Sequence, residues 1–97
     1  MAKRLAPEEI RERLAALPEW KLDEKTIVRK LRFADFRAAI AFVNRLAEVA
    51  EAADHHPDIS IHYREVTLTL WTHTVDGLTT KDFELAAAIE QLEKVER

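Results

Sequence analysis

Two short runs of alternating apolar and polar residues constrain the fold of this chain most. Residues 59–71 read ISIHYREVTLTLW, and every second residue is apolar on both sides of a charged pair. Successive side chains of a β-strand point to opposite faces, so this period of two predicts two strands with one buried face each. Arg64 and Glu65 are expected to form the turn between them, which makes an antiparallel hairpin.

A second hairpin is predicted over residues 20–33, WKLDEKTIVRKLRF. Apolar residues alternate there on both sides of the polar stretch DEKT, which is typical of a turn. Hairpins pair their strands in antiparallel fashion, so the two together predict an antiparallel sheet of four strands.

Helical patterns occupy the segments around the hairpins. Pro7, followed by two glutamates, is typical of a first helical turn, and Pro18 ends that pattern. Asp35 is a candidate N-cap for a long helix with two neighbouring apolar rows, and this broad apolar face predicts burial on more than one side. Thr79 and Asp82 resemble a capping box that opens a last helix over residues 81–96.

The order helix, hairpin, helix, hairpin, helix predicts an α+β fold. We expect a four-stranded antiparallel sheet from two hairpins with three helices packed on one face. The chain has 97 residues and shows no internal repeat or linker, so residues 1–97 are expected to form a single domain.

Composition excludes several classes of function. Fifteen Lys and Arg against eighteen Asp and Glu give a net charge of −3, so the overall charge does not favour nucleic acid or an anionic membrane as a partner. The longest apolar run, AAIAFV at 38–43, is far shorter than the ~20 residues that cross a bilayer. Cysteine is absent, which removes thiol chemistry and favours a cytoplasmic location.

Histidines gather where the long helix must end. Pro57 disfavours helical geometry at His56, so His55 and His56 should lie at a corner between helix and strand. Glu51 lies one turn before His55, where its carboxylate could orient an imidazole. His73 follows a strand and should lie at the end of the sheet. Each also has an ordinary explanation, because histidines at a helix C-terminus or in a surface turn are often simply solvated.

Other chemistry has less support. Three histidines could bind a metal ion, but neighbouring residues in an extended segment point in different directions, and no His-Glu-x-x-His pair is present, so we expect no metal site. With one glycine, no G-x-S-x-G turn and no cysteine, neither a phosphate-binding loop nor a nucleophile is indicated. His62 is expected on a solvated strand face. Proton transfer by imidazoles is the chemistry that remains.

The second half of the chain resembles the signature of the pterin-4a-carbinolamine dehydratases. In that signature a charged residue is followed by three spacers, His-His-Pro, an aromatic residue, a later histidine and an aspartate. The corresponding residues here are Glu51, His55, His56, Pro57, Tyr63, His73 and Asp82. The helix and hairpin order is also similar to that of the family, so the resemblance extends over about the whole chain.

This resemblance implies a dehydratase that acts on 4a-hydroxytetrahydropterin, the product of aromatic amino acid hydroxylases, and releases quinonoid dihydropterin for reuse. It implies an acid/base set of His55, His56 and His73, with no cofactor. Within this set we expect His55 and His73 to transfer protons and His56 to position the pterin. The residues expected to contribute to substrate binding are Glu51, Asp54, Pro57, Lys81 and Asp82, with Asp82 at the edge of the pocket and Tyr63 engaged in packing.

Two residues depart from the family pattern. Ile59 stands where many members have an aromatic residue, and Lys81 stands where arginine is common, so pterin affinity is the property they affect. The resemblance also implies a homodimer or homotetramer. As an alternative to catalysis, it implies a dimerisation module that acts as a transcriptional cofactor, because vertebrate members bind a homeodomain transcription factor.

Overall fold

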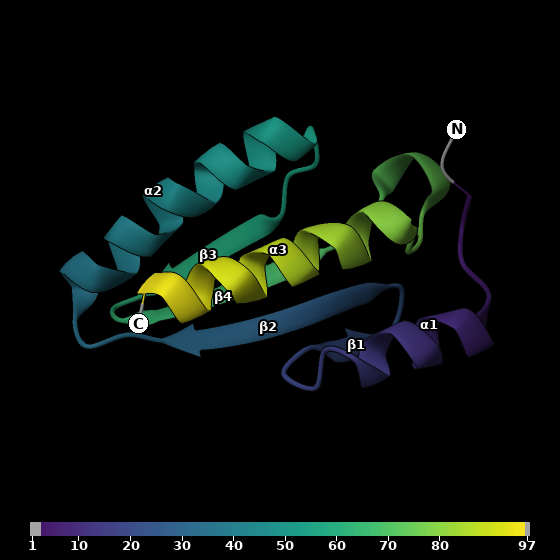
Figure 1. The fold of residues 1–97 in the computed structure, drawn as a ribbon, viewed down its shortest axis with the longest axis horizontal. Helices are drawn as coiled ribbons and strands as arrows, with labels where there is room; N and C mark the ends of the chain where they lie inside the picture. The colour runs from purple at the N-terminus through teal and green to yellow at the C-terminus, as the bar shows by residue number, and fades with distance from the viewer. Residues whose placement is uncertain (1–2, 97) are drawn as a thin grey trace.

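The computed structural model describes residues 3–96 of the chain, and Figure 1 shows their arrangement. The elements follow the predicted order, with a short 3-10 helix added between the last strand and the last helix. They are α1 (Pro7–Ala15), β1 (Lys21–Asp23), β2 (Thr26–Arg32), α2 (Phe36–Ala53), β3 (Asp58–His62), β4 (Glu65–Leu70), η1 (His73–Val75) and α3 (Thr80–Glu96).

All neighbouring strands of the sheet are antiparallel, in the order β1-β2-β4-β3. Each predicted hairpin forms, and β2 and β4 pair in the centre. The second hairpin turns one residue earlier than predicted, because His62 pairs with Glu65 and leaves Tyr63 and Arg64 in the turn.

Tyr63 was expected to pack as part of the apolar alternation, and this prediction was wrong for the single chain. Its backbone has a φ of 57°, in the left-handed region, and its side chain is 64% exposed. The turn needs a left-handed residue at this point, so Tyr63 leaves the pleat of β3 and its alternating direction is lost.

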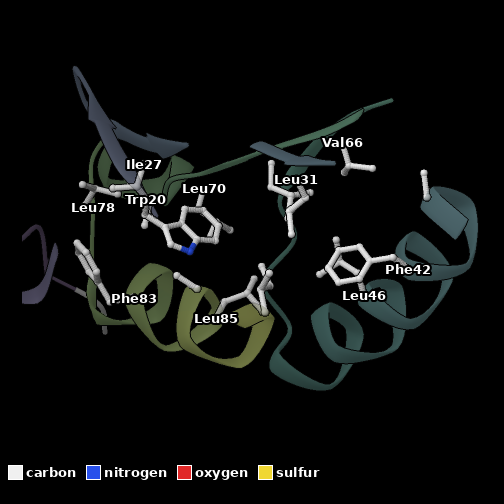
Figure 2. Packing of buried hydrophobic residues seen from close by; sticks show 14 residues of the cluster. Trp20, Ile27, Leu31, Phe42, Leu46, Val66, Leu70, Leu78, Phe83 and Leu85 are labelled. Atoms are coloured by element: carbon white, nitrogen blue, oxygen red, sulfur yellow. The ribbon is translucent and has the colours of Figure 1, made fainter. Parts of the chain in front are cut away.

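The core lies between the sheet and two helices. Figure 2 shows Leu31 and Leu70 from the sheet facing Leu46 of α2 and Leu85 of α3, and all four are buried. The α1 helix adds partly buried residues that pack against the same cluster. This arrangement confirms the predicted α+β fold.

The α2 helix begins as predicted. Asp35 is its N-cap, with a carboxylate oxygen 2.8 Å from the amide nitrogen of Ala38. Full burial, however, is confined to one row, Ala39, Phe42, Leu46 and Ala50. In the neighbouring row Ile40 and Val43 are only partly buried, and Phe36 is 51% exposed. Among the helices described, none is long and apolar enough to span a bilayer.

Candidate active site

A hollow of about 420 Å³ lies where the end of α2, the end of β4 and the start of α3 meet. Residues 54–56 contribute one side, residues 71–74 contribute another, and Lys81 completes the lining. All three predicted histidines, His55, His56 and His73, therefore line one hollow, although 18 positions separate His55 from His73 in sequence.

The corner that presents His55 is a well-defined helix ending. The amide of Asp54 donates to the carbonyl of Glu51 at 3.1 Å, and the amide of His55 donates to that of Ala50 at 3.2 Å. This pair of bonds is the Schellman motif, which requires a left-handed residue just after the helix. Asp54 supplies it with a φ of 51°. The motif reverses the chain direction and turns His55 towards α3.

His55 is held by a buried carboxylate. Its Nε2 atom lies 2.6 Å from Oδ1 of Asp82, which is 0% exposed, while the His55 side chain is 12% exposed. A carboxylate only accepts hydrogen bonds, so Nε2 carries the shared proton, and Nδ1 is the acceptor nitrogen of the neutral ring. The contact thus fixes both the orientation of the ring and its tautomer.

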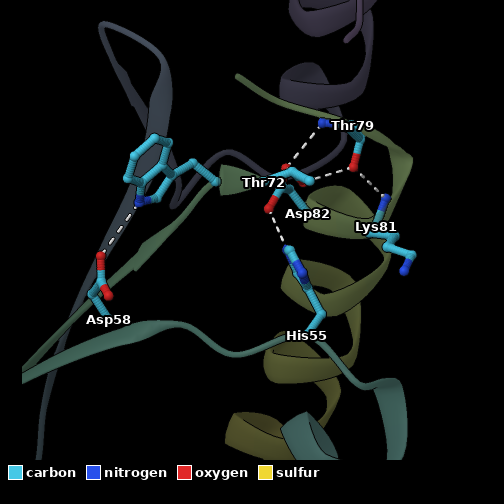
Figure 3. A network of polar contacts seen from close by, with 7 residues as sticks. His55, Asp58, Thr72, Thr79, Lys81 and Asp82 are labelled. Atoms are coloured by element: carbon cyan, nitrogen blue, oxygen red, sulfur yellow. Dashed lines mark hydrogen bonds and ion pairs between the residues drawn. The ribbon is translucent and has the colours of Figure 1, made fainter. Parts of the chain in front are cut away.

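The second oxygen of Asp82 belongs to a chain of hydrogen bonds in which the donor of each bond can be assigned (Figure 3). Oδ2 accepts from the hydroxyl of Thr72 at 2.8 Å and from the amide of Thr79 at 2.9 Å. The single proton of Thr72 is used in that bond, so the Thr79 hydroxyl must donate to Thr72, at 2.8 Å. The Thr79 oxygen in turn accepts from the amide of Lys81 at 3.2 Å.

This network confirms the predicted capping box and adds to it. The amide of Thr79 and the hydroxyl of Thr72 both donate to one oxygen of Asp82, and the other oxygen faces His55. Every donor is buried or part-buried, so water does not compete for these bonds, and the network holds His55 in one orientation. Asp82 is therefore buried next to His55. It does not line the hollow, so its predicted place at the edge of the pocket was wrong.

His56 has a carboxylate partner of a different kind. Its Nε2 lies 2.6 Å from Oε2 of Glu51, with side chains 56% and 74% exposed respectively. Glu51 was expected one turn behind His55, but the corner turns His55 towards α3 and leaves His56 on the Glu51 side. An exposed pair of this type contributes only about 0 to 1 kcal/mol, so His56 is held less firmly than His55.

His73 lies against an aromatic ring. The centroids of Trp71 and His73 are 3.9 Å apart, with an angle of 32° between the planes. The indole nitrogen of Trp71 donates to Asp58 at 3.4 Å, and the Lys25 ammonium lies 5.1 Å from the centre of the ring. Lys25 also donates to Asp76 at 2.6 Å and thereby holds the pKa of that carboxyl below its ordinary value of 3.8.

The other predicted residues divide into two groups. Asp54 and Lys81 line the hollow, whereas Pro57 lies at the corner outside its lining, and His62 is exposed at the far end of β3. Within residues 3–96, no three His, Cys, Asp or Glu side chains are grouped so that they could hold a metal ion.

Sequence reasoning missed three residues of the lining. Trp71, Thr72 and Thr74 flank His73 and contribute to the hollow. A signal was present, because residues next to a candidate histidine at a strand end share its edge of the sheet. Thr72 also has a role that the sequence did not reveal, namely the hydrogen bond to Asp82.

The chain is similar to known proteins over most of its length. The family model described as "Pterin 4 alpha carbinolamine dehydratase" matches residues 3–92. A protein of Acidobacterium capsulatum that carries the provisional name pterin-4-alpha-carbinolamine dehydratase is 57% identical over 88 residues, which cover 91% of this chain and 96% of that protein. A Picosynechococcus protein with the same provisional name is 52% identical over 92 residues, with coverage of 95% and 100%.

Solved structures show the same fold. A crystal structure of a transcriptional coactivator/pterin dehydratase from Brucella melitensis matches with a TM-score of 0.88 and 35% identity, and the match covers 93% of this chain and 98% of that one. The family match spans nearly all the described residues and includes the hollow with its three histidines. The chain therefore belongs to the pterin-4a-carbinolamine dehydratase family.

Proposed function

We propose that this protein is a hydro-lyase that dehydrates 4a-hydroxytetrahydropterin to quinonoid dihydropterin by histidine acid/base catalysis. The observation that carries the proposal is the fixed His55 imidazole, with its Nε2 2.6 Å from the buried Asp82 carboxylate, in a hollow that His56 and His73 also line. The family membership and the provisional names of its relatives support the choice of substrate.

The reaction needs two proton transfers. The bond between carbon 4a and its hydroxyl oxygen breaks, the neighbouring ring nitrogen loses its proton, and a carbon–nitrogen double bond forms as water leaves. A general acid must protonate the leaving oxygen, and a general base must take the proton from nitrogen. Imidazole has an unperturbed pKa near ~6.5 and suits both tasks at neutral pH.

His55 is suited to act as the base. Because Nε2 is occupied by Asp82, the neutral ring offers the lone pair of Nδ1, and the carboxylate stabilises the imidazolium that forms when Nδ1 takes a proton. This assignment leaves His73 as the second proton-transfer group. His56, with its exposed Glu51 partner, is assigned to positioning the pterin, together with Asp54 and Lys81 from the lining.

The rate of dehydration tests this proposal. Freshly made 4a-hydroxytetrahydropterin is mixed with the protein, and loss of the substrate is followed by ultraviolet absorbance against the spontaneous reaction. His55→Ala and His73→Ala should each lower the enzymatic rate by about 10²- to 10⁴-fold, which is typical for a positioned acid or base. His62→Ala is the matched control, because His62 is exposed on β3 and outside the hollow.

Two results would contradict the proposal. A wild-type rate equal to the spontaneous rate would exclude dehydratase activity on this substrate. Equal losses in the His55→Ala, His73→Ala and His62→Ala variants would exclude a specific role for the histidines of the hollow. Treatment with a chelator tests the metal alternative, since loss of both bound metal and activity would require a metal-assisted mechanism instead.

The biological role follows from the same chemistry. We assign the protein to tetrahydropterin recycling beside an aromatic amino acid hydroxylase in the cytoplasm, as the family resemblance implies. Deletion of the gene should then cause the 4a-hydroxy product to persist when the hydroxylase is active. Normal turnover of that product in the deletion strain would argue against this role.

Self-association is the second part of the proposal. Phe36 on α2 is 51% exposed, and Ile59 and Ile61 on the edge strand β3 are 40% and 37% exposed, so apolar surface remains for a second copy. Light scattering should give a dimer or tetramer of the 11.2 kDa chain. Phe36→Glu should lower the measured mass, and a wild-type mass of one chain would contradict the assembly.

A binding module is the alternative function. The Brucella melitensis relative is described as both coactivator and dehydratase, and the exposed Phe36 of α2, with Ile40 and Val43 partly buried beside it, would serve a partner in such a role. A protein that assembles normally but shows no dehydratase activity would favour this alternative over catalysis.

A further inference from the structure

We infer that Trp71 is the positioning residue for His73, and that its ring restrains the orientation of this imidazole, as Asp82 restrains that of His55. The inference rests on the proposed function for its catalytic consequence, and on the geometry of the two rings for its structural content. Trp71 is not a member of the expected acid/base or substrate-binding set.

His73 lacks the kind of partner that fixes the other two histidines. His55 has Asp82 and His56 has Glu51, each at 2.6 Å. Over residues 3–96, no hydrogen bond joins an imidazole nitrogen of His73 to another side chain, and His73 is exposed. An exposed side chain without such a bond samples several rotamers, so its orientation must come from packing.

The ring of Trp71 provides that packing. With centroids 3.9 Å apart and planes 32° apart, the indole covers a face of the imidazole in a stacked arrangement. Stacking restrains the plane of His73 and leaves the in-plane nitrogens free. Both nitrogens therefore remain available to a substrate in the hollow, which a carboxylate partner would not allow.

Trp71 is itself held in place from two other elements. Its Nε1 donates to Asp58 at the start of β3, a bond drawn in Figure 3, and Lys25 from the turn between β1 and β2 lies over its ring. Lys25 also pairs with Asp76, in the loop that carries His73. The indole is thus fixed relative to the sheet and to the loop, so it can restrain the imidazole.

Trp71 is not one of the fully buried residues of the core. Leu70, the preceding residue and the last of β4, is buried, whereas Trp71 is half-buried and packs against the main cluster from outside it. Trp71→Leu keeps an apolar side chain for this contact, so the substitution should leave the fold intact.

The test compares two substitutions of Trp71 in the dehydratase assay. Trp71→Leu should lower kcat by about 10- to 100-fold, as expected for a misplaced catalytic group, with a smaller change in KM. Trp71→Phe restores an aromatic face and should recover most of the rate. Tyr63→Leu removes a 64% exposed ring at the distant hairpin turn and serves as the matched control.

A double variant shows whether Trp71 acts through His73. In a His73→Ala background, Trp71→Leu should cause a further loss below about twofold, because the group that it positions is gone. Full multiplication of the two single effects would overturn the inference. Thermal unfolding of each variant identifies any loss that is due to unfolding.

A measurement without substrate keeps this test separate from the proposed function. In proton–carbon correlation NMR spectra, the ring protons of His73 should move downfield in Trp71→Leu, because they lose the ring current of the indole, while those of His55 stay. Unchanged His73 signals would overturn the inference even if the enzyme is active. A wild-type protein without dehydratase activity would overturn the proposed function, and the NMR result would still decide the contact.

Discussion

At the scale of single residues, one buried carboxylate links the helix end to the proposed chemistry. Asp82 accepts three hydrogen bonds, from His55, Thr72 and the amide of Thr79. An aspartate at this point of a capping box would stabilise α3 without any further role. Because its second oxygen faces an imidazole across 2.6 Å, the same residue sets the tautomer on which the proposed base depends.

Asp82→Asn should therefore separate structure from activity. The amide oxygen can keep the bonds from Thr72 and Thr79, but the amide nitrogen then donates to Nε2 of His55 and forces the proton onto Nδ1. A base with its proton in the wrong place should lower kcat by about 10²- to 10⁴-fold, while thermal unfolding changes little.

Glu51→Gln is the matched control for this prediction. It makes the same chemical change at the exposed partner of His56, where water can replace the lost contact, so its effect on kcat should be much smaller. Equal losses in the two variants would show that burial of the carboxylate has no influence on the rate.

At the scale of elements, the C-terminal end of α2 determines where the histidines lie. The Schellman bonds and the left-handed Asp54 turn the chain within two residues, and Pro57 then commits it to the extended conformation of β3. His55 and His56 are adjacent at this corner, and their side chains point in different directions. One reaches Asp82 on α3, and the other stays beside Glu51 on α2.

Substitution of Asp54 tests the backbone requirement at this corner. Asp54→Val should lower the free energy of unfolding by about 1 to 3 kcal/mol, because a β-branched residue resists the left-handed region. Asp54→Gly should stay within about 0.5 kcal/mol of wild type, since glycine has no such penalty. Urea unfolding measures both, and Ala53→Val, one position earlier in the helix, is the control.

An Asp54→Val variant as stable as Asp54→Gly would contradict the left-handed geometry. In the variant that is destabilised, dehydratase activity should also fall, because the amide of His55 takes part in the same motif.

At the scale of the whole molecule, a small core supports a site built from three separate elements. The ends of α2, β4 and α3 meet at the hollow only while the two helices stay packed on the sheet. Domains of this size are stable by only about 5 to 15 kcal/mol, so a single core residue carries a large share of that stability.

Phe42 is the residue that tests this dependence. It is 1% exposed on α2, and its ring lies 5.0 Å from that of Phe33. Phe42→Ala should lower the free energy of unfolding by about 3 to 5 kcal/mol in urea, because a large cavity replaces the ring. A loss below about 1 kcal/mol would show that α2 is not held by this core.

Local patterns in the sequence predict the α-helices, the four strands and the location of His55, His56 and His73 at their ends. These patterns involve only a few neighbouring residues, so they can be recognised without a structure. They are the apolar periods of two and of 3.6 residues, the Asp35 cap, the Thr79 capping box and Pro57. Family resemblance added the grouping of His55, His56 and His73, which spacing alone left open.

The partner of each imidazole, by contrast, depends on tertiary packing. Asp82 is 27 residues from His55 in sequence, and the bond between them depends on how α2 and α3 pack on the sheet. The ring contact of Trp71 with His73 likewise depends on the path of the chain after β4. Local patterns cannot specify such contacts, because their geometry follows from packing between elements that are distant in the chain.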